Sequence, residues 1–358
     1  MPSMHAELLS AADPRWAAFL AAGRHDFYHL PGYVELCARH EGGEAAAFWA
    51  EDGGAAMLAP MVLRPLPAEL GQESWRDAVA PYGYPCPLLR GDPPDATVAA
   101  FLGAFRDQGA ARGIVAAFLR LHPLLPLPEA PFRQFGALVE HGSTVYLDLG
   151  LGAEELARQT RANHLADARR LEREGYRVVV DRWEQMDEFI RIYEETMSYR
   201  SAVAYYRFGR DYYRELRQCL GERLHLSVVL APDGSGAAAG LFTQVDGMVQ
   251  FHLSGTSDAH RRAGPAKLML IHMRDWARGR GARFLHLGGG VGCREDSLAF
   301  FKQGFSKLRS RFQTFRMVLD PDRYQALVRR RGLPEEDPGA PGGFFPAYRR
   351  PAALPEQP

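Results

Sequence analysis

The order of secondary-structure elements expected between residues 224 and 304 restricts the fold of this chain more than any other feature. Three strands separated by tight turns come first, at 224–230, 237–245 and 248–254. They are followed by a helix, a strand and a second, short helix, at 267–278, 283–287 and 296–304. A meander of strands that continues into alternating helix and strand predicts an α/β fold.

The first half of the sequence shows a similar order more faintly. Two strands flank a tight turn and are followed by a helix and a strand, at 45–50, 55–66, 96–108 and 114–121. Because 358 residues exceed what one hydrophobic core usually organises, we expect two domains, 1–150 and 151–331. Three helices are expected after that boundary, at 154–174, 183–197 and 209–219. The segment 332–358 is rich in proline and glycine and is predicted to be a tail, loose or laid over the surface.

The charge of the chain is zero overall but unevenly distributed. Residues 257–331 hold 17 Lys and Arg against six Asp and Glu. A basic field of this kind suits a partner that carries phosphate, either a nucleotide cofactor or an RNA. The alternative is a solvated basic surface on an arginine-rich chain.

Several classes of protein find no support in the sequence. The four cysteines lie far apart and predict neither a disulfide framework nor a metal site. No apolar run reaches the roughly 18 residues of a membrane span, and the first thirty residues are interrupted by charge, so we expect a cytoplasmic protein without membrane insertion. The glycines from Gly288 to Gly292 fail the G-x-G-x-x-G pattern because Cys293 holds the sixth position. Neither a Walker A loop, a G-x-S-x-G elbow nor an H-E-x-x-H helix occurs.

The loop 257–266 lies at the start of the helix that follows the meander. A helix start offers unpaired backbone N–H groups and a positive dipole end, and Arg261, Arg262 and Lys267 add cationic side chains, which favours an anion-binding site. Arg261-x-x-Gly264-x-Ala266 also matches the minimal R/Q-x-x-G-x-G/A pattern by which GNAT acetyltransferases hold the pyrophosphate of acetyl-CoA. The alternative is a Gly-Pro helix entry flanked by solvated arginines.

The next block is more specific. The strand 284–287 runs into the glycines of 288–292, and a short helix then ends in Phe301-Lys302-Gln303-Gly304-Phe305. This block resembles the signature region of the Fem family and the FemAB-like (BioF2-like) acetyltransferases, in which a GG-containing strand end precedes F-K-x-G-F. The segments 252–257 and 158–175 resemble that family's YGAS-like strand and its R-x-x-x-N-x-x-basic-A helix. The resemblance spans 158–316, and the first half joins it weakly through the PYGYP sequence of 81–85.

The resemblance implies two tandem GNAT-like domains, each a mixed sheet flanked by helices, and transfer of an acyl or aminoacyl group to an amine. In Fem-type enzymes the donor is an aminoacyl-tRNA, and in other branches acyl-CoA is the presumed donor. We therefore expect aminoacyl-tRNA as co-substrate, with acyl-CoA as the alternative, and no tightly bound cofactor. The expected acceptor is an amine of a small molecule or peptide.

The resemblance also assigns catalytic roles. Phe301 and Lys302 match the family's Phe-Lys pair, whose lysine helps to stabilise charge on the tRNA ester as an amine attacks it. The chemistry agrees, because aminolysis of an ester generates an oxyanion that a fixed cationic donor stabilises. His252, His286 and Asp296 are the nearby candidates for accepting a proton from the amine. The alternatives are a solvated lysine, hydrogen-bonded strand histidines and an aspartate that caps the short helix.

Two positions depart from the Fem pattern. Ser254 replaces the tyrosine of the YGAS-like strand, and His286 stands where Fem sequences commonly carry an acidic residue. Both departures argue against a cell-wall substrate and favour a small-molecule or natural-product acceptor. We expect acceptor binding by aromatic and polar residues of a cleft between the domains: Tyr82, Tyr84, Tyr206, Arg207 and Ser254. A binding protein without turnover, built on a degenerate GNAT-like cleft, is the alternative from another class.

Overall fold

The computed structural model describes residues 4–71, 74–199, 208–334, 337–340 and 342–351. The chain forms two compact units. Unit 1 consists of Met1–His141 together with Phe312–Pro358, and unit 2 of Gly142–Arg311. The division expected from the sequence treats each domain as one continuous stretch, whereas unit 1 combines both ends of the chain.

Unit 1 has a mixed sheet with the strand order β1-β2-β3-β4-β6-β13, and β5 pairs with β3. Its strands are β1 (His5–Ser10), β2 (Glu44–Asp52), β3 (Ala55–Pro65), β4 (Arg76–Val79), β5 (Leu88–Arg90), β6 (Ile114–Arg120), the start of β7 (Ala137–Asp148) and most of β13 (Arg309–Val318). Its helices are α1 (Pro14–Ala21), α2 (Pro31–Glu41), α3 (Asp95–Ala111), α4 (Glu129–Phe135) and α11 (Pro321–Arg330). The expected hairpin is present, since Gly53 and Gly54 form the turn between β2 and β3.

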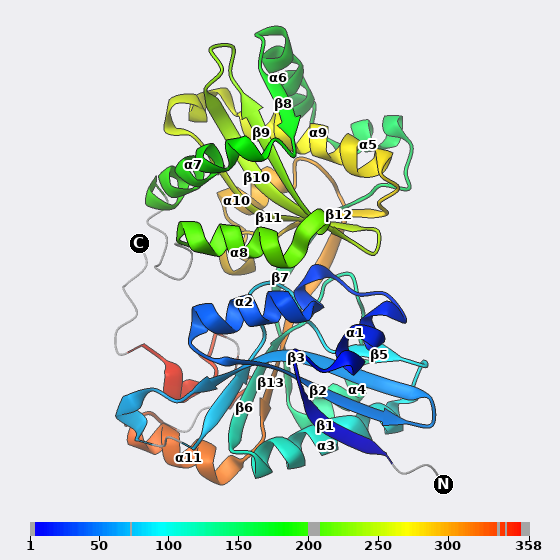
Figure 1. Cartoon of the computed structure of the whole chain (residues 1–358), viewed down its shortest axis with the longest axis vertical. Helices are drawn as coiled ribbons and strands as arrows, with labels where there is room; N and C mark the ends of the chain where they lie inside the picture. Colours follow the sequence, from blue (N-terminus) through cyan, green and yellow to red (C-terminus); the bar gives the residue numbers. More distant parts are fainter. Residues whose placement is uncertain (1–3, 72–73, 200–207, 335–336, 341, 352–358) are drawn as a thin grey trace. The chain divides into compact units, whose positions relative to one another are not determined.

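Helices cover both faces of the unit 1 sheet (Figure 1). An apolar core lies under α3 and α4, where Phe48 of β2 packs 4.9 Å from Phe105 of α3, measured between ring centroids. α2 contacts β2 and β3. A smaller cluster joins β6 to α11 and to the C-terminal segment.

That C-terminal segment is not loose where the structure describes it. Phe345 and Tyr348 are buried against Tyr324 of α11. Arg349 forms an ion pair with the buried carboxylate of Asp77, which Arg64 also contacts at 3.0 Å. Aromatic burial and a shared carboxylate therefore anchor residues 345–349, a detail that proline and glycine content does not reveal.

The strands of unit 2 pair in the order β7-β12-β11-β10-β9-β8. The strands other than β7 are β8 (Arg177–Val180), β9 (Leu224–Leu230), β10 (Gly236–Val245), β11 (Met248–Thr256) and β12 (Phe284–Gly288). The helices are α5 (Ala153–Gln159), α6 (Ala162–Arg173), α7 (Met186–Tyr199), α8 (Arg210–Leu220), α9 (Pro265–Gly279) and α10 (Ser297–Lys302). The predicted meander of β9, β10 and β11 is confirmed, as are the helix, strand and short helix that follow it.

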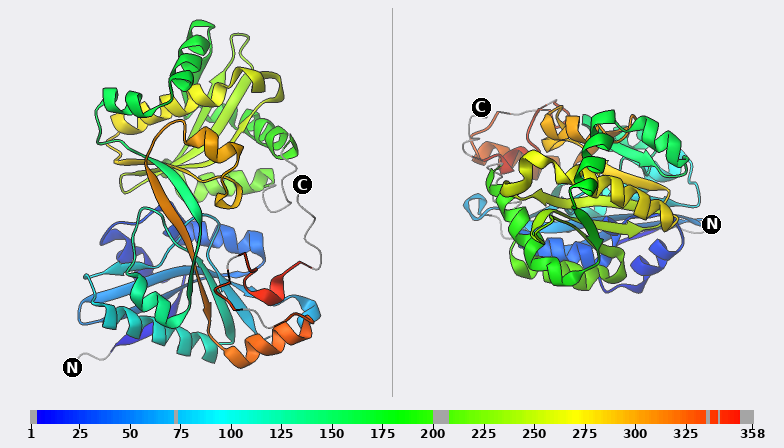
Figure 2. Two further views of the ribbon diagram at one scale, coloured as in Figure 1. Left: turned by 180° about the vertical axis from the view of Figure 1, so that it is seen from behind. Right: turned by 90° about the horizontal axis from the view of Figure 1, so that it is seen from above.

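α7 and α9 pack on opposite faces of the unit 2 sheet. Gly240 and Gly255 show this, because a Cβ on the first would meet Met269 of α9 and a Cβ on the second would meet α7. Figure 2 shows α9, in yellow, lying across the strands of unit 2. The main apolar core lies on the α9 face and includes Leu171 of α6.

One predicted helix is broken in two. The helix expected at 154–174 is interrupted between α5 and α6, because Thr160 and Arg161 adopt extended backbone conformations. The Thr160 hydroxyl donates to the Leu156 carbonyl, and the Arg161 N–H donates to the Gly304 carbonyl. This break ties the helices to the end of α10. No helix in the described part of the chain is long and apolar enough to span a membrane.

Candidate active site

The two parallel strands of unit 2 diverge at one end. β11 and β12 pair only where Met248–Gln250 meet Phe284–His286, although β11 continues to Thr256. The pairing of β11 with β10 also shifts around His252, which stands between the pairs Leu241–Leu253 and Phe242–Phe251. A bulge of this kind re-aims side chains and leaves backbone groups outside the regular ladder. The parallel pair is therefore open at the carboxyl end of β11.

The proposed anion loop follows that open end directly. Residues 258–263 form tight turns, Gly264 adopts the left-handed conformation, and Pro265 begins α9. Arg261 forms an ion pair with Asp258, and its guanidinium lies 3.7 Å from the ring centroid of Tyr199. Lys267 pairs with Asp167 of α6. The two cations are therefore anchored beside the helix start.

The remaining predicted residues of this loop differ in accessibility. Arg262 is exposed, whereas Gly264 and Ala266 are partly buried. Ala266 stands in the first turn of α9, where backbone N–H groups have no partner within the helix. The structure thus brings all five predicted cofactor-binding residues to one helix start.

The glycine-rich segment after β12 is held by an aspartate. Asp296 accepts hydrogen bonds from the backbone N–H of Ala299 at 2.8 Å and of Val291 at 2.9 Å. Asp296 is therefore the N-cap of α10, which is the structural alternative to its predicted catalytic role. Cys293 in the same segment has a positive φ of 59°, a strained conformation for a residue with a side chain.

Lys302 stands at the end of α10 and points into the protein. Only 9% of the residue is exposed, and its Nζ donates to the Gly289 carbonyl oxygen at 2.7 Å. Burial lowers the pKa of the Lys302 amine to about 8, against the opposing effects of Cys293 and Asp296. The interpretation of Lys302 as a solvated lysine is therefore wrong. It is a desolvated amine fixed on the glycine-rich segment.

Around Lys302, the F-K-x-G-F segment packs on His164 of α6. The His164 ring lies 5.6 Å from the Phe301 ring and 4.7 Å from the Phe305 ring, measured between centroids. A Cβ on Gly304 would come within 2.0 Å of His164 Cε1, so this close approach requires glycine. Burial, together with Lys267 and Arg161, lowers the pKa of His164 to about 4. His164 has no obvious signal in the sequence, because only the fold brings α6 to α10.

The other predicted residues of unit 2 lie along the strands. His286 is 1% exposed, and its Nδ1 lies 2.7 Å from Gln250 Oε1 on the paired strand. His252 is partly buried at the bulge of β11. Ser254 pairs with Gly240 and shares its face, which is the face that α9 covers. A catalytic role for the two histidines stays a prediction.

The acceptor residues predicted in the first half belong to unit 1. The backbone carbonyl of Tyr82 accepts a hydrogen bond from the Tyr33 hydroxyl at 2.8 Å. The partly buried ring of Tyr84 lies edge-on to Tyr28, His122 and Phe312. Tyr206 and Arg207 lie outside the described residues.

A buried polar cluster beside these tyrosines has no counterpart in the sequence analysis. His122 Nε2 lies 2.9 Å from Asp26 Oδ2, and both side chains are fully buried. The Leu124 N–H donates to His122 Nδ1, so the Nε2 nitrogen carries the proton that the carboxylate accepts. Asp26 and His122 are 96 residues apart. Among the described residues, no group of three or more His, Cys, Asp or Glu is placed to hold a metal ion.

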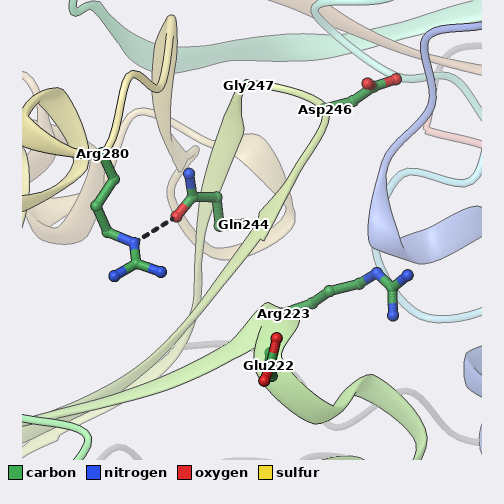
Figure 3. A pocket seen from close by; sticks show the side chains of 6 residues that line it. All are labelled: Glu222, Arg223, Gln244, Asp246, Gly247 and Arg280. Atoms are coloured by element: carbon green, nitrogen blue, oxygen red, sulfur yellow. Dashed lines mark hydrogen bonds between the residues drawn. The ribbon is translucent and has the colours of Figure 1, made fainter.

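A pocket on the surface of unit 2 lies at the turn after β10 (Figure 3). Its lining is formed by Glu222, Arg223, Gln244, Asp246, Gly247 and Arg280. Arg280 donates to Gln244 Oε1 at 3.2 Å and stacks on Trp276. None of the predicted site residues lines this pocket, so we place the candidate site at the open end of β11 and around Lys302 instead.

Comparison with known proteins identifies the fold of the chain. Residues 158–296 match the family model described as acetyltransferase (GNAT) domain. Among solved structures, FemX has a TM-score of 0.68 at 12% identity and covers 89% of this chain and 99% of its own. The chain therefore has a tandem GNAT-like fold. The fold class expected from the sequence is confirmed.

Two further solved structures are similar to this chain. L-PGS from Bacillus licheniformis has a TM-score of 0.54 at 16% identity and covers 91% of this chain and 98% of its own. A tandem GNAT protein from the clavulanic acid biosynthesis pathway has a TM-score of 0.51 at 12% identity and covers 89% of this chain and 99% of its own. No curated protein sequence matches the chain. At these identities the likeness concerns the fold.

Proposed function

We propose that this Fem-like protein is an amide-forming acyltransferase that moves an aminoacyl group from aminoacyl-tRNA to an amine of a small molecule or peptide. Unit 2 would hold the donor, and unit 1 would contribute to acceptor binding. The buried Lys302 carries the proposal, because a desolvated amine held on the glycine-rich segment suits charge stabilisation better than a structural role. The Fem-like resemblance of the surrounding F-K-x-G-F segment supports the choice of donor.

The chemistry requires one bond to form and one to break. The nitrogen of a neutral acceptor amine attacks the ester carbonyl, and the negative charge that develops on the carbonyl oxygen is stabilised by the Lys302 ammonium. The intermediate collapses with departure of the ribose oxygen, which takes up the proton that the amine releases. Removing one preorganised oxyanion donor typically raises the barrier by about 2.7–4 kcal/mol.

The depressed pKa of Lys302 suits this role at neutral pH. An amine with a pKa of about 8 is mostly protonated at pH 7, yet it can exchange a proton within the reaction cycle. Because charged tRNA is made where proteins are synthesised, the proposal also carries the expectation of a cytoplasmic enzyme.

Acyl-CoA-dependent N-acyl transfer is the second candidate. The observation that favours it is the start of α9, where Arg261, Gly264 and Ala266 follow the open end of β11. A diphosphate there would meet cationic side chains and the positive end of the α9 dipole. Both candidates use unit 2 for the donor and differ in which anion it recognises.

Donor dependence tests the proposal. Purified protein is incubated with total tRNA charged with radiolabelled amino acids, or with labelled acetyl-CoA, together with a pool of amines from cell extract. Transfer from charged tRNA that is abolished by RNase supports the first candidate, and transfer from acetyl-CoA supports the second. Binding without consumption of either donor would instead favour a non-catalytic protein.

The role of Lys302 is tested within the active system. Lys302→Ala is expected to lower kcat about 100- to 1000-fold while the protein remains folded, because the oxyanion loses its charged donor. Lys302→Arg keeps the positive charge and is expected to retain more activity than the alanine variant. Full turnover by a folded Lys302→Ala protein would remove the assignment.

A further inference from the structure

One face of the β6–β13 strand pair in unit 1 concentrates positive charge. Register pairs Arg120 with Thr314 and Phe118 with Arg316, so these four side chains share a face. The alternate residues of both strands belong to the apolar core under α3. The charged face is therefore the one turned away from that core.

A histidine from β7 joins this face. His141 Nε2 lies 2.8 Å from the Thr314 hydroxyl oxygen. Burial lowers the pKa of His141, and the nearby charges of Arg316 and Arg120 lower it further. Three groups able to carry positive charge, Arg120, His141 and Arg316, are thus within electrostatic reach of one another.

In the described part of unit 1, no carboxylate compensates the two arginines. Arg120 donates to the backbone carbonyls of residues 80 and 81, and Arg316 donates to those of residues 338 and 340. Burying cations without an anionic partner is unfavourable, and carbonyl dipoles repay only part of that cost. The arrangement is complementary to an oxyanion that reaches this face.

Only one end of the face is open. Arg316 is 4% exposed, and its guanidinium lies 6.0 Å from the ring of Phe345 in the C-terminal segment. Arg120 and His141 remain partly exposed. The partly exposed ring of Phe312 stands beside them, 5.5 Å from the His141 ring and 5.3 Å from the Tyr84 ring. A ligand would therefore meet a cationic end and an aromatic wall.

We propose that Arg120 and His141 form an anion-binding site in unit 1, which holds a carboxylate or phosphate group of the acceptor against Tyr84 and Phe312. The identity of the ligand as acceptor rests on the proposed function, whereas the anion site itself rests on the geometry of unit 1. Arg316 is more deeply buried, and its positive charge stabilises the bound anion without direct contact. The site therefore selects acceptors that carry a negative charge in addition to their amine.

Binding is measured without any donor, so that it does not depend on turnover. The full chain is labelled with ¹³C at histidine Cε1, and the His141 resonance, assigned with His141→Gln, is followed during titration. The probes are inorganic phosphate, glycylglycine and glycylglycinamide, which lacks the carboxylate. Saturable shifts with phosphate or glycylglycine but not with glycylglycinamide are expected, and whichever anion saturates identifies phosphate or carboxylate as the group recognised.

Variants separate this site from general charge effects. Arg120→Gln is expected to weaken binding about tenfold or more, as loss of a charge-assisted hydrogen bond would. Arg133→Gln, an exposed arginine paired with Glu129, serves as the matched control and is expected to bind normally. If Arg120→Gln does not fold, Arg120→Lys replaces it, with weakened binding again expected because the planar fork is lost.

The outcomes separate the two proposals. Absence of saturable binding by the folded wild-type protein, or equal binding by the folded Arg120 variant, would overturn the anion site whatever the donor assay shows. Saturable binding that depends on Arg120, in a protein that consumes no donor, would keep the anion site and remove the proposed transferase function.

Discussion

Both units contain a β–α–β crossover between parallel strands, but the two crossover helices begin in opposite electrostatic environments. In unit 2, α9 connects β11 to β12 and begins beside Arg261 and Lys267. In unit 1, α3 connects β4 to β6, and its first residue is Asp95, with Asp92 shortly before it. Because a helix start favours anions, the acidic residues of unit 1 complement the start of α3, whereas the start of α9 is flanked by cations that suit an anionic ligand. The same architecture thus carries basic residues at the helix start in unit 2, where the proposed anion site lies, and acidic residues at the helix start in unit 1.

The segments after the second strand of each crossover differ in a similar way. After β6, His122 is buried against Asp26, so each polar group has a charged or polar partner. After β12, the buried amine of Lys302 donates to a backbone carbonyl oxygen, and it forms no salt bridge in the described part of unit 2. A satisfied network stabilises a scaffold, whereas an uncompensated buried amine costs stability and is typical of functional sites. The comparison supports the proposed division, in which unit 2 carries the chemistry and unit 1 contributes to acceptor binding.

The largest effect on stability is expected from Lys302, where the difference between the units is sharpest. The fall of its pKa from 10.5 to about 8 corresponds to about 3 kcal/mol, an upper bound on what burial of the charge costs. Below pH 8 the lysine is protonated in both states, and the folded state bears the whole cost. Between about pH 8 and 10.5 the unfolded state binds more protons, so stability rises with pH.

Lys302→Met should remove this dependence and raise the free energy of unfolding at pH 7 by about 1–3 kcal/mol. Urea unfolding of wild type and variant at pH 7 and pH 10 measures it. Lys307→Met, at an exposed lysine, is the control and should change neither value. A Lys302→Met protein less stable than wild type at pH 7 would show that the buried amine is structural.

Gly304 tests how tightly α10 is packed in unit 2. Gly304→Ala would place a Cβ 2.0 Å from His164 Cε1, and we expect about 1–3 kcal/mol lower stability from this overpacking. Gly279→Ala at the end of α9 meets nothing within 4 Å and should leave stability nearly unchanged. Thermal unfolding compares the two variants. If His164→Ala added to Gly304→Ala fails to restore any stability, the clash is not the cause.

The difference between the two helix starts can be tested by placing a carboxylate in the first turn of α9. Ala266→Asp should weaken binding of inorganic pyrophosphate about tenfold, since the new charge occupies the seat that an anion would take. Ala266→Ser has a similar size without charge and is expected to bind normally. Isothermal titration calorimetry measures both, and unchanged affinity in the aspartate variant would mean that pyrophosphate binds elsewhere.

The smallest effect is expected on α3. Asp95→Ala should lower the stability of the protein by about 0.3–1 kcal/mol, because the helix start loses its own anion, and the loss should shrink at high salt. Asp107→Ala, later on the same helix and also exposed, is the control with little expected effect. Urea unfolding at low and high salt provides the measurement. A salt-independent loss would point to packing instead of the helix dipole.

Local patterns in the sequence accounted for most elements of unit 2. The turn at Asp246 and Gly247, the Gly-Pro entry of α9 and the Asp296 cap each depend on residues close together in the chain. Where a local pattern was interrupted by a distant contact, prediction failed. The helix expected at 154–174 breaks because the Arg161 N–H bonds to the Gly304 carbonyl, a contact that helix periodicity does not contain.

The sequence by itself determined the α/β class, the order of strands and helices around the candidate site, and the residue types available there, because turns, caps and periodicity act over a few residues. Only the tertiary structure decided which of them are buried and what they face. Lys302 is a desolvated amine because the folded chain buries its side chain at the end of α10. His141 contacts Thr314, although the two residues are 173 positions apart in the sequence. The last strand, β13, belongs to unit 1 because it pairs with β6. That pairing depends on complementary faces that no local pattern encodes.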